Sequence, residues 1–307
     1  MKRPLIFTGN WNKQLVNDIC TLAGTPLGKA NVSTFSDGEI NVDLQEQLHG
    51  ANVVFIQSTS PPANNLLELL FMIAAASRSG AKHITAIIPY FGYSRHDRKT
   101  SNGSNISASD VARMLELVGV NRVISFDLHS AMCQGFFGPR VQVDNINVHR
   151  LFLEHLSGLE KVAIVSADAG AYSRSVHFLN MLANAYPSYD ISSAMIFKQR
   201  LTANQVADAK LCGTVEGRTA IIVDDIVDTA GTLCKAAELL IANGAASVFA
   251  VITHGIFSGS ALHKIRSSCI KRIITTDSIR HNETILREPK IQIVSLCPEI
   301  ANIIANV

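Results

Sequence analysis

Residues 220–232 have the sequence Ala220-Ile221-Ile222-Val223-Asp224-Asp225-Ile226-Val227-Asp228-Thr229-Ala230-Gly231-Thr232. The segment begins as a continuous apolar run, as a strand buried on both faces would, and then changes to small and acidic residues. After Thr232, apolar residues recur at helical spacing until Asn243-Gly244 interrupts them. We therefore expect a strand, a tight loop and a helix in this order.

The loop at 228–232 has the composition of a phosphate-binding site, because small residues let an anion approach the backbone N–H groups of a helix N-terminus. Asp224 and Asp225 would repel that phosphate, but carboxylates accept hydrogen bonds from a vicinal diol or hold a divalent ion. A ligand with a phosphate at one end and a diol at the other, such as ribose 5-phosphate, accounts for both features. The alternative is an ordinary strand-to-helix turn, with Asp228 as a helix cap and the acidic pair in solvent.

Composition favours a folded protein of two domains, since 307 residues allow roughly 150 residues for each core. Hydrophobic residues make up 47% of the chain, and a net charge of +2 gives no reason to expect a nucleic-acid partner. The six cysteines show no C-x-x-C spacing, which argues against a zinc site or a disulfide framework. The N-terminal apolar run ends at Gly9, and the run at 66–76 is too short to span a bilayer. We expect a cytoplasmic protein that does not bind a membrane.

Most of the chain alternates strand-like and helix-like segments, which predicts an α/β fold with largely parallel sheets. Residues 53–70 can be aligned without a gap on the segment that begins at Ile221, and in both copies a Gly-Ala pair and another apolar strand follow. We therefore expect two similar domains in tandem, 1–145 and 146–295. The interval 57–65 of the first copy lacks the acidic pair and the glycine, so only the second domain should bind ribose phosphate. Residues 296–307 could form a short helix that packs back on the first domain.

A basic and aromatic segment, 89–99, follows the buried strand Ile84–Ile88, at the end of a strand where α/β folds bind ligands. Its rings, two arginines and a lysine suit a nucleotide with its phosphates, although a solvated basic loop is the alternative. The turn at 35–40 suggests no function from its composition.

Two further strands end in His129 and Asp168, one in each predicted domain. Each residue alone is an ordinary structural residue, but the pair suggests an Mg²⁺ ion shared between the domains. Lys198 and Arg200 emerge from another apolar strand. Such cations could stabilise a transferring phosphoryl group, or they could be ordinary strand-end residues.

Residues 223–232 resemble the phosphoribosyl-pyrophosphate binding motif of type I phosphoribosyltransferases and ribose-phosphate pyrophosphokinases. Four other segments resemble only the pyrophosphokinase family, and together they extend the similarity over nearly the whole chain: 35–40, 89–99, 122–129 with 134–137, and 253–259. The resemblance implies two tandem type I phosphoribosyltransferase-like domains, each a mainly parallel sheet flanked by helices. It also implies transfer of the pyrophosphoryl group of ATP to ribose 5-phosphate, which yields AMP and phosphoribosyl pyrophosphate.

The resemblance also implies a role for each matching residue. Those on the ATP side are Asp37 and Glu39 for adenine, and Arg95, His96 and Asp97 for other contacts to ATP. Those expected to hold Mg²⁺ are His129 and Asp168. Those for ribose 5-phosphate are Asp224 and Asp225 at the hydroxyls, directly or through a cation, and Asp228, Thr229, Ala230, Gly231 and Thr232 at the phosphate. Those that stabilise the transferring group are Lys198 and Arg200. The family further implies a homo-oligomer, a hexamer, in which Asp37 and Glu39 reach a neighbouring subunit's site.

The chain departs from the family at several positions. The unusual residues are His96 for Gln, Phe197 for Asp, Ala167 for Pro, Ala171 for Gly, Ser173 for Lys and His49 for Arg. The last substitution puts regulation by phosphate and ADP in doubt. Two other functions remain as alternatives: a catalytically silent regulatory relative, and a phosphoribosyltransferase that consumes the pyrophosphate compound.

Overall fold

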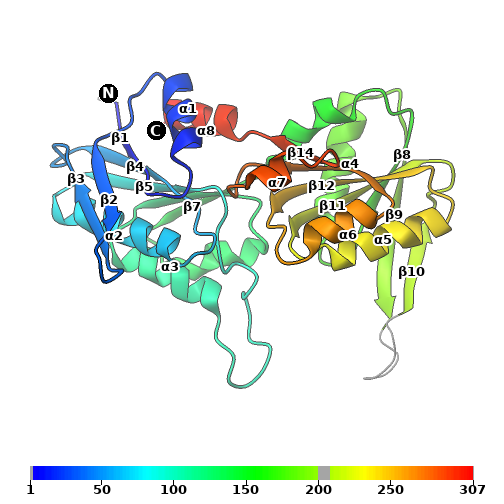
Figure 1. Ribbon diagram of the computed structural model, residues 1–307, viewed down its shortest axis with the longest axis horizontal. Coiled ribbons are helices and arrows are strands. Elements are labelled where there is room, and N and C mark those ends of the chain that lie inside the picture. The colour runs from blue at the N-terminus through cyan, green and yellow to red at the C-terminus, as the bar shows by residue number, and fades with distance from the viewer. Residues whose placement is uncertain (1–2, 200–207, 307) are drawn as a thin grey trace. The chain divides into compact units, whose positions relative to one another are not determined.

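The computed structural model describes residues 3–199 and 208–306, which form two compact units (Figure 1). Unit 1 comprises the residues up to Asn147 together with Ser278–Arg280 and the segment from Ser295 onward. Unit 2 comprises Val148–Asp277 and His281–Val294. Residues 278–280, which the sequence placed in the second domain, therefore group with unit 1.

Unit 1 contains a five-stranded parallel sheet in the order β1-β4-β5-β6-β7. Its strands are β1 (Leu5–Phe7), β4 (Asn52–Ile56), β5 (His83–Ile88), β6 (Arg122–Phe126) and β7 (Gln142–Ile146). A separate antiparallel hairpin consists of β2 (Ala30–Thr34) and β3 (Ile40–Leu44). The helices are α1 (Lys13–Leu22), α2 (Asn64–Arg78), α3 (Ser107–Leu117), the 3-10 helix η1 (Ala131–Phe136) and α8 (Cys297–Ala305).

Unit 2 contains a seven-stranded sheet in the order β10-β9-β8-β11-β12-β13-β14, parallel except for the β9–β10 pair. Its strands are β8 (Lys161–Ser166), β9 (Asp190–Gln199), β10 (Asp208–Gly213), β11 (Thr219–Val227), β12 (Ser247–Gly255), β13 (Ile270–Thr276) and β14 (Ile291–Val294). The helices are the 3-10 helix η2 (His149–Leu156), α4 (Tyr172–Ala185), α5 (Gly231–Ala242), α6 (Ala261–Ser267) and α7 (Glu283–Leu286).

The core of unit 2 explains why its central strands are continuous apolar runs. Side chains alternate between the two faces of a strand, so a strand covered by helices on both faces needs apolar residues at every position. In β11, Ala220 and Ile222 pack with α5 and α6, whereas Ile221 and Val223 pack with α4 and η2. The expected α/β fold with mainly parallel sheets is confirmed.

The same argument applies to unit 1, where Val53, Phe55 and Ala86 pack against α2 and α3. The C-terminal helix α8 belongs to this unit and contacts α1, and its Ile300 and Ile304 are buried. Apart from their outer edges, the two sheets have matching strand orders, with β4 in the place of β11 and β5 in the place of β12.

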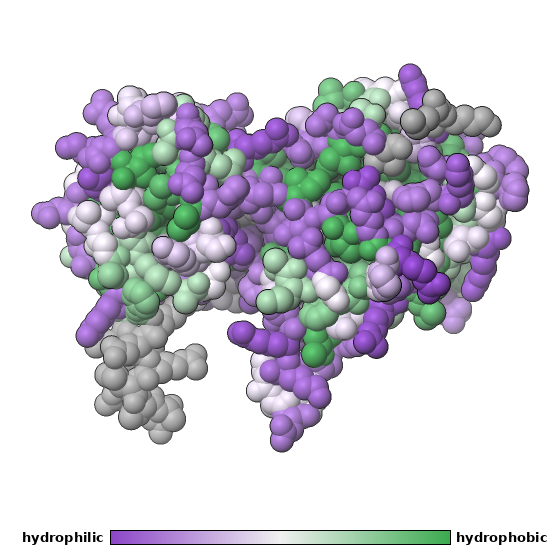
Figure 2. Space-filling model, turned by 180° about the vertical axis from the view of Figure 1, so that it is seen from behind, coloured by the Kyte–Doolittle hydropathy of each residue, from purple (hydrophilic) through white to green (hydrophobic). Residues whose placement is uncertain are grey.

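The surface in Figure 2 is mostly hydrophilic on the face shown, with smaller hydrophobic areas between the polar ones. Within 3–199 and 208–306, no helix combines the length and the hydrophobicity needed to cross a membrane.

Candidate active site

The predicted phosphate loop joins β11 to the N-terminus of α5. Ala230 is the N-cap residue and adopts a left-handed backbone conformation, with φ of 59°, while its side chain is buried. A change of backbone hand of this kind is typical of loops whose successive N–H groups point toward one side and bind an anion. The flanking Thr229 and Thr232 are exposed, so their hydroxyls are accessible to a ligand.

A second segment supports this loop from the end of the neighbouring strand β12. The backbone N–H of Ile256 donates to Val227 O at 2.8 Å, and that of Ser258 donates to Asp228 O at 3.1 Å. The Ser258 hydroxyl also donates to Asp228 Oδ1. Asp228 therefore connects the loop to the segment that follows β12, and it is not simply a solvated residue.

Lys264 of α6 adds a positive charge beside the loop that the sequence did not reveal. Its Nζ donates to Thr229 O at 3.1 Å. A Cβ atom built on Gly231 would lie 3.8 Å from the same Nζ. The ammonium group thus lies next to the backbone groups that are predicted to bind phosphate.

The acidic pair lies within β11, two residues before the strand ends at Val227, and is held by an arginine from α4. Asp225 is buried, whereas the Asp224 side chain is about one quarter exposed, at 26%. Arg174 Nη1 is 3.1 Å from Asp224 Oδ1 and 3.2 Å from Asp225 Oδ1. Burial and, secondly, the adjacent Asp225 carboxylate raise the pKa of Asp224 to about 7, although the Arg174 charge opposes both effects.

Asp168 lies at the same edge of the unit 2 sheet as the acidic pair. It follows β8, whose last residue, Ser166, pairs with Val223 immediately before Asp224. Its Oδ1 accepts a hydrogen bond from the backbone N–H of Ala171 at 3.1 Å, and the Ser166 hydroxyl donates to its carbonyl at 2.6 Å. The structure therefore brings together, in unit 2, a carboxylate, an acidic pair and a phosphate loop that are far apart in the sequence.

In unit 1, the predicted ATP residues lie on two separate loops. Asp37 and Glu39 belong to the turn of the β2–β3 hairpin, where both are exposed and Asp37 Oδ1 accepts from Glu39 N at 3.0 Å. Arg95 and His96 are exposed on the loop that follows β5, and Asp97 is partly buried.

His129 follows β6 and is exposed. The η1 helix begins two residues later and contains the buried Cys133. Burial and, secondly, the negative charge of Asp97 raise the pKa of the Cys133 thiol to about 11. The Cys133 Sγ also lies 3.9 Å from Ser94 O, so the loop after β5 lies beside the η1 helix that His129 precedes.

Comparison with known proteins identifies the family. The N-terminal domain of ribose phosphate pyrophosphokinase matches residues 4–119, and the phosphoribosyl synthetase-associated domain matches residues 185–307. The chain is 43% identical over 295 residues to a ribose-phosphate pyrophosphokinase of Burkholderia pseudomallei, covering 95% of this chain and 90% of the relative. The chain belongs to the ribose-phosphate pyrophosphokinase family. A relative with the same name in Vibrio vulnificus is 43% identical, with coverage of 98% and 95%.

The fold agrees with this assignment to the pyrophosphokinase family. The crystal structure of phosphoribosylpyrophosphate synthetase from Mycobacterium smegmatis matches with a TM-score of 0.88 and 31% sequence identity. The match covers 99% of this chain and 98% of that protein, so it includes both units. The expectation that the chain is a member of this family is confirmed.

Of the two predicted cations, only Lys198 has a backbone among the described residues. The backbone of Lys198 lies in β9 and pairs with Ala209 of β10. Arg200 lies outside the described residues. Phe197, which stands where the family commonly has Asp, is 48% exposed.

Two of the other departures from the family lie close to Asp168. Ala167 and Ala171 are buried, on either side of the turn that carries the carboxylate. Their small side chains occupy positions where the family usually has proline and glycine, and the turn still forms, with the Ala171 N–H bonded to Asp168.

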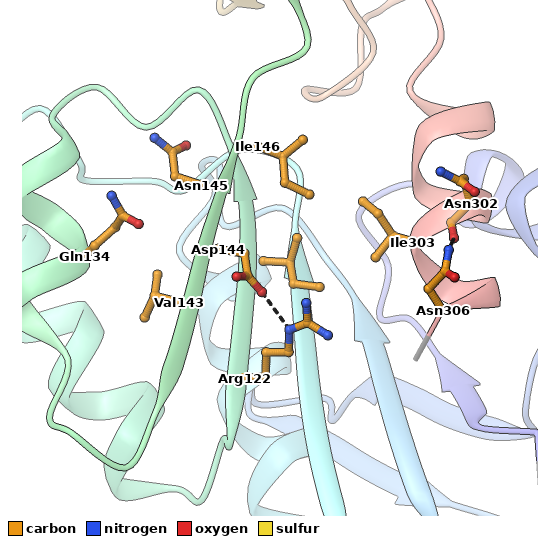
Figure 3. Close-up of a pocket in the computed structure, with 10 residues that line it drawn as sticks. Arg122, Gln134, Val143, Asp144, Asn145, Ile146, Asn302, Ile303 and Asn306 are labelled. Carbon is orange, nitrogen blue, oxygen red and sulfur yellow. Dashed lines mark hydrogen bonds and ion pairs between the residues drawn. The ribbon is translucent and has the colours of Figure 1, made fainter. Parts of the chain in front are cut away.

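Unit 1 also contains a pocket of about 560 Å³ between β6, β7, η1 and α8 (Figure 3). Arg122 Nε donates to Asp144 Oδ2 at 2.6 Å on one side, and Asn306 Nδ2 donates to Asn302 O at 2.8 Å on the other. The lining is mixed, with polar residues such as Gln134 and Asn145 beside apolar ones such as Val143 and Ile303. None of the described residues that line this pocket is a predicted substrate ligand.

Proposed function

We propose that this protein is a ribose-phosphate diphosphokinase that converts ATP and ribose 5-phosphate to AMP and 5-phospho-α-D-ribose 1-diphosphate. In this reaction the anomeric oxygen of ribose 5-phosphate bonds to the β-phosphorus of ATP. The bond between that phosphorus and the α,β-bridging oxygen breaks, AMP leaves, and the hydroxyl proton passes to solvent. The observation that carries the proposal is the strand end of β11, where Asp224 and Asp225 precede a phosphate loop capped by Ala230.

The two ends of this site match the two ends of the sugar phosphate. The carboxylates accept hydrogen bonds from the 2- and 3-hydroxyls, directly or through a cation. The loop Asp228-Thr229-Ala230-Gly231-Thr232 donates backbone N–H groups and hydroxyls to the 5-phosphate. Binding at both ends fixes the anomeric oxygen for attack, so that much of the catalysis consists of positioning.

ATP binds residues of unit 1 in this proposal. Arg95, His96 and Asp97 contact the nucleotide from the loop after β5. Asp37 and Glu39 contact adenine in the site of a neighbouring subunit of a homo-oligomer, a hexamer by resemblance to the family. The exposure of the hairpin turn and of its Phe35, at 56%, supports a role in contact with another molecule.

His129 and Asp168 would hold Mg²⁺ on the ATP phosphates. Among the described residues, no group of three or more His, Cys, Asp or Glu side chains forms a metal site by itself. Two protein ligands would suffice for Mg²⁺, which usually keeps several waters and is bound by one or two carboxylates together with substrate phosphates. The ion, when bound, neutralises negative charge on the phosphate chain.

Lys198 and Arg200 would stabilise charge on the transferring group, since a cation that acts mainly in the transition state raises turnover. We also place the enzyme in the cytoplasm, which agrees with six free cysteines.

The direct test is the formation of AMP and phosphoribosyl pyrophosphate from ATP and ribose 5-phosphate with Mg²⁺, with and without inorganic phosphate. We expect the two products in equal amounts. The comparison with phosphate shows whether His49, in place of the usual arginine, has altered regulation. No product under either condition, with ATP still bound, would favour the catalytically silent relative. Nucleotide formation from phosphoribosyl pyrophosphate and a free base would favour a phosphoribosyltransferase.

A further inference from the structure

The loop after β4 in unit 1 has the place in the sheet that the phosphate loop has in unit 2, but it lacks the acidic pair and the glycine. Its residues Ser58 and Thr59 are nevertheless polar and almost completely buried, at 0% and 2% exposure. Buried hydroxyls are costly unless they form hydrogen bonds. Their partners therefore indicate what this loop does.

Both residues form hydrogen bonds with the segment 89–99, which carries the predicted ATP ligands. Thr59 Oγ1 accepts from the backbone N–H of Gly92 at 2.7 Å, and the Thr59 N–H donates to Tyr90 O at 3.0 Å. Ser58 Oγ accepts from the Tyr90 N–H at 2.9 Å. The two side chains thus fix the chain immediately after β5, where the regular ladder of the sheet has ended.

A further hydrogen bond links this point to the short segment Ser278–Arg280. Ser58 Oγ donates to Ser278 O at 2.6 Å, although the two residues are 220 positions apart in sequence. Ser278 groups with unit 1. The Ser58 hydroxyl therefore connects the loop after β4 with Tyr90, near the start of the segment 89–99, and with Ser278.

The approach of the two loops is too close for any side chain at position 92. A Cβ atom on Gly92 would lie 2.1 Å from Thr59 O. The next residue, Tyr93, has a φ of 66°, a left-handed conformation that is uncommon for a residue with a bulky side chain. Its carbonyl accepts from His96 N at 3.0 Å, so the turn leads directly to Arg95 and His96.

The other side of the segment is anchored as well. The buried Phe91 contacts Phe137 edge to face, with ring centroids 6.3 Å apart. The backbone N–H of Ala108, at the start of α3, donates to His96 O at 3.2 Å. A displacement at Tyr90 or Gly92 would therefore be transmitted through a short, strained turn to the exposed Arg95 and His96.

We propose that Ser58 and Thr59 are positioning residues for ATP, because their hydroxyls fix the base of the segment that presents Arg95 and His96. The β4 loop thus supports the nucleotide side in unit 1, whereas the loop in the same place in unit 2 binds the sugar phosphate itself. This inference rests on the proposed function, since it assumes that the segment 89–99 contacts ATP.

The test compares three variants of the full-length enzyme with the wild type. Thr59→Val keeps the shape of the side chain but removes the acceptor for Gly92, and Thr59→Ser restores it. The matched control is Ser125→Ala, which removes an equally buried hydroxyl that donates to Ile88 O at 2.8 Å, just before the segment. For each variant we would measure KM for both substrates, kcat and the melting temperature.

We expect Thr59→Val to raise KM for ATP by roughly tenfold, because the arginine and histidine lose their fixed orientation. KM for ribose 5-phosphate should stay within about twofold, and Thr59→Ser should recover most of the loss. Ser125→Ala should lower the melting temperature without the selective change in KM for ATP. If Thr59→Val does not fold, Ser58→Ala gives the same measurement with the Thr59 hydroxyl in place.

Two results would overturn the inference while leaving the proposed function intact. One is an unchanged KM for ATP in Thr59→Val, and the other is an equal rise in both KM values that Ser125→Ala reproduces. Absence of product from the wild-type enzyme would instead overturn the proposed function. The two failures are therefore distinguishable.

Discussion

Arg174 and Asp224 form an ion pair at the centre of the predicted ribose site, with Arg174 Nη1 3.1 Å from Asp224 Oδ1. The same nitrogen lies 3.2 Å from Asp225 Oδ1. One cation therefore offsets the repulsion between two adjacent carboxylates, of which one is buried and the other mostly so. The arginine comes from α4, so the acidic pair keeps its geometry only while α4 remains packed on the sheet.

The first prediction concerns Arg174→Ala. Without the guanidinium, the carboxylates lose their orientation and Asp224 becomes harder to ionise. We expect KM for ribose 5-phosphate to rise by roughly tenfold, with KM for ATP within about twofold, in steady-state assays.

A suitable control is Arg218→Ala. Arg218 also pairs with an aspartate, Asp190, at 2.9 Å. Arg218 directly precedes β11 and Asp190 begins β9, so this pair lies at the amino ends of the strands, away from the acidic pair. Both KM values should be unchanged in this variant. A similar loss of ribose 5-phosphate affinity in both variants would mean that Arg174 acts only through general stability.

The second prediction is that Asp224→Asn stabilises the protein at alkaline pH. The pKa of Asp224 is raised from its ordinary value of 3.8 to about 7 by burial and by Asp225. The native state therefore binds more protons than the unfolded state between these values, so the group's contribution to stability is lost as pH rises from about 4 to about 7. Asparagine removes this penalty, and we expect a gain of roughly 1 to 3 kcal/mol at pH 8 in urea unfolding.

No gain should appear well below pH 4, where the aspartate is protonated in both states. The comparison of the two pH values separates the ionisation effect from a change in packing. A gain of equal size at both pH values would contradict the assignment.

The third prediction follows from the same carboxylate in the wild-type enzyme. In the proposed site, an ionised Asp224 would accept hydrogen bonds from the ribose hydroxyls, whereas its protonated form must use one oxygen as a donor. We expect KM for ribose 5-phosphate to rise as pH falls from about 8 to about 6, while KM for ATP changes less. A flat profile for ribose 5-phosphate over this range would show that Asp224 stays ionised once the substrate binds.

The fourth prediction concerns Lys264→Gln. The ammonium group lies beside Thr229 and Gly231, so it adds a positive charge to the predicted 5-phosphate site. We expect KM for ribose 5-phosphate to rise by roughly tenfold, with a smaller effect when ribose 5-phosphate is near saturation. Lys271→Gln is the matched control because Lys271 is exposed on β13. If both variants raise KM for ribose 5-phosphate equally, Lys264 acts only through the net charge of the protein.

The fold was predictable because its signals are local. Strands such as Ile221–Val223 need apolar residues on both faces, and Gly-Ala pairs mark where the helices end. The phosphate loop was predictable for the same reason, since its small residues follow directly after a strand and precede a helix.

The contacts that complete the site were less accessible from sequence because they join distant positions. Lys264 is 35 residues from Thr229, and Arg174 is 50 residues from Asp224. Neither residue has a spacing that identifies its partner, and only the parallel order of the strands brings these segments to one edge. The role of Ser58 depends on Ser278, which is 220 residues away. The site residues assigned from sequence remain predictions, to be tested by the variants described here.

The fifth prediction concerns Lys198→Ala. The Lys198 backbone pairs with Ala209 near the end of β9, so the sheet fixes the backbone at this residue. A cation that acts on charge developed during pyrophosphoryl transfer contributes little to the binding of ATP itself. We expect kcat to fall by roughly 10²- to 10³-fold, with the dissociation constant of ATP within about threefold.

Lys210→Ala is the control for this change, since Lys210 is an exposed lysine on the partner strand and pairs with Phe197. It removes the same charge from the same hairpin, so it reports any effect on the hairpin as a whole. We expect its kcat to match the wild type. If Lys198→Ala weakens ATP binding and leaves kcat unchanged, the lysine serves ground-state binding instead. If neither quantity changes, the transferring group is stabilised by other residues.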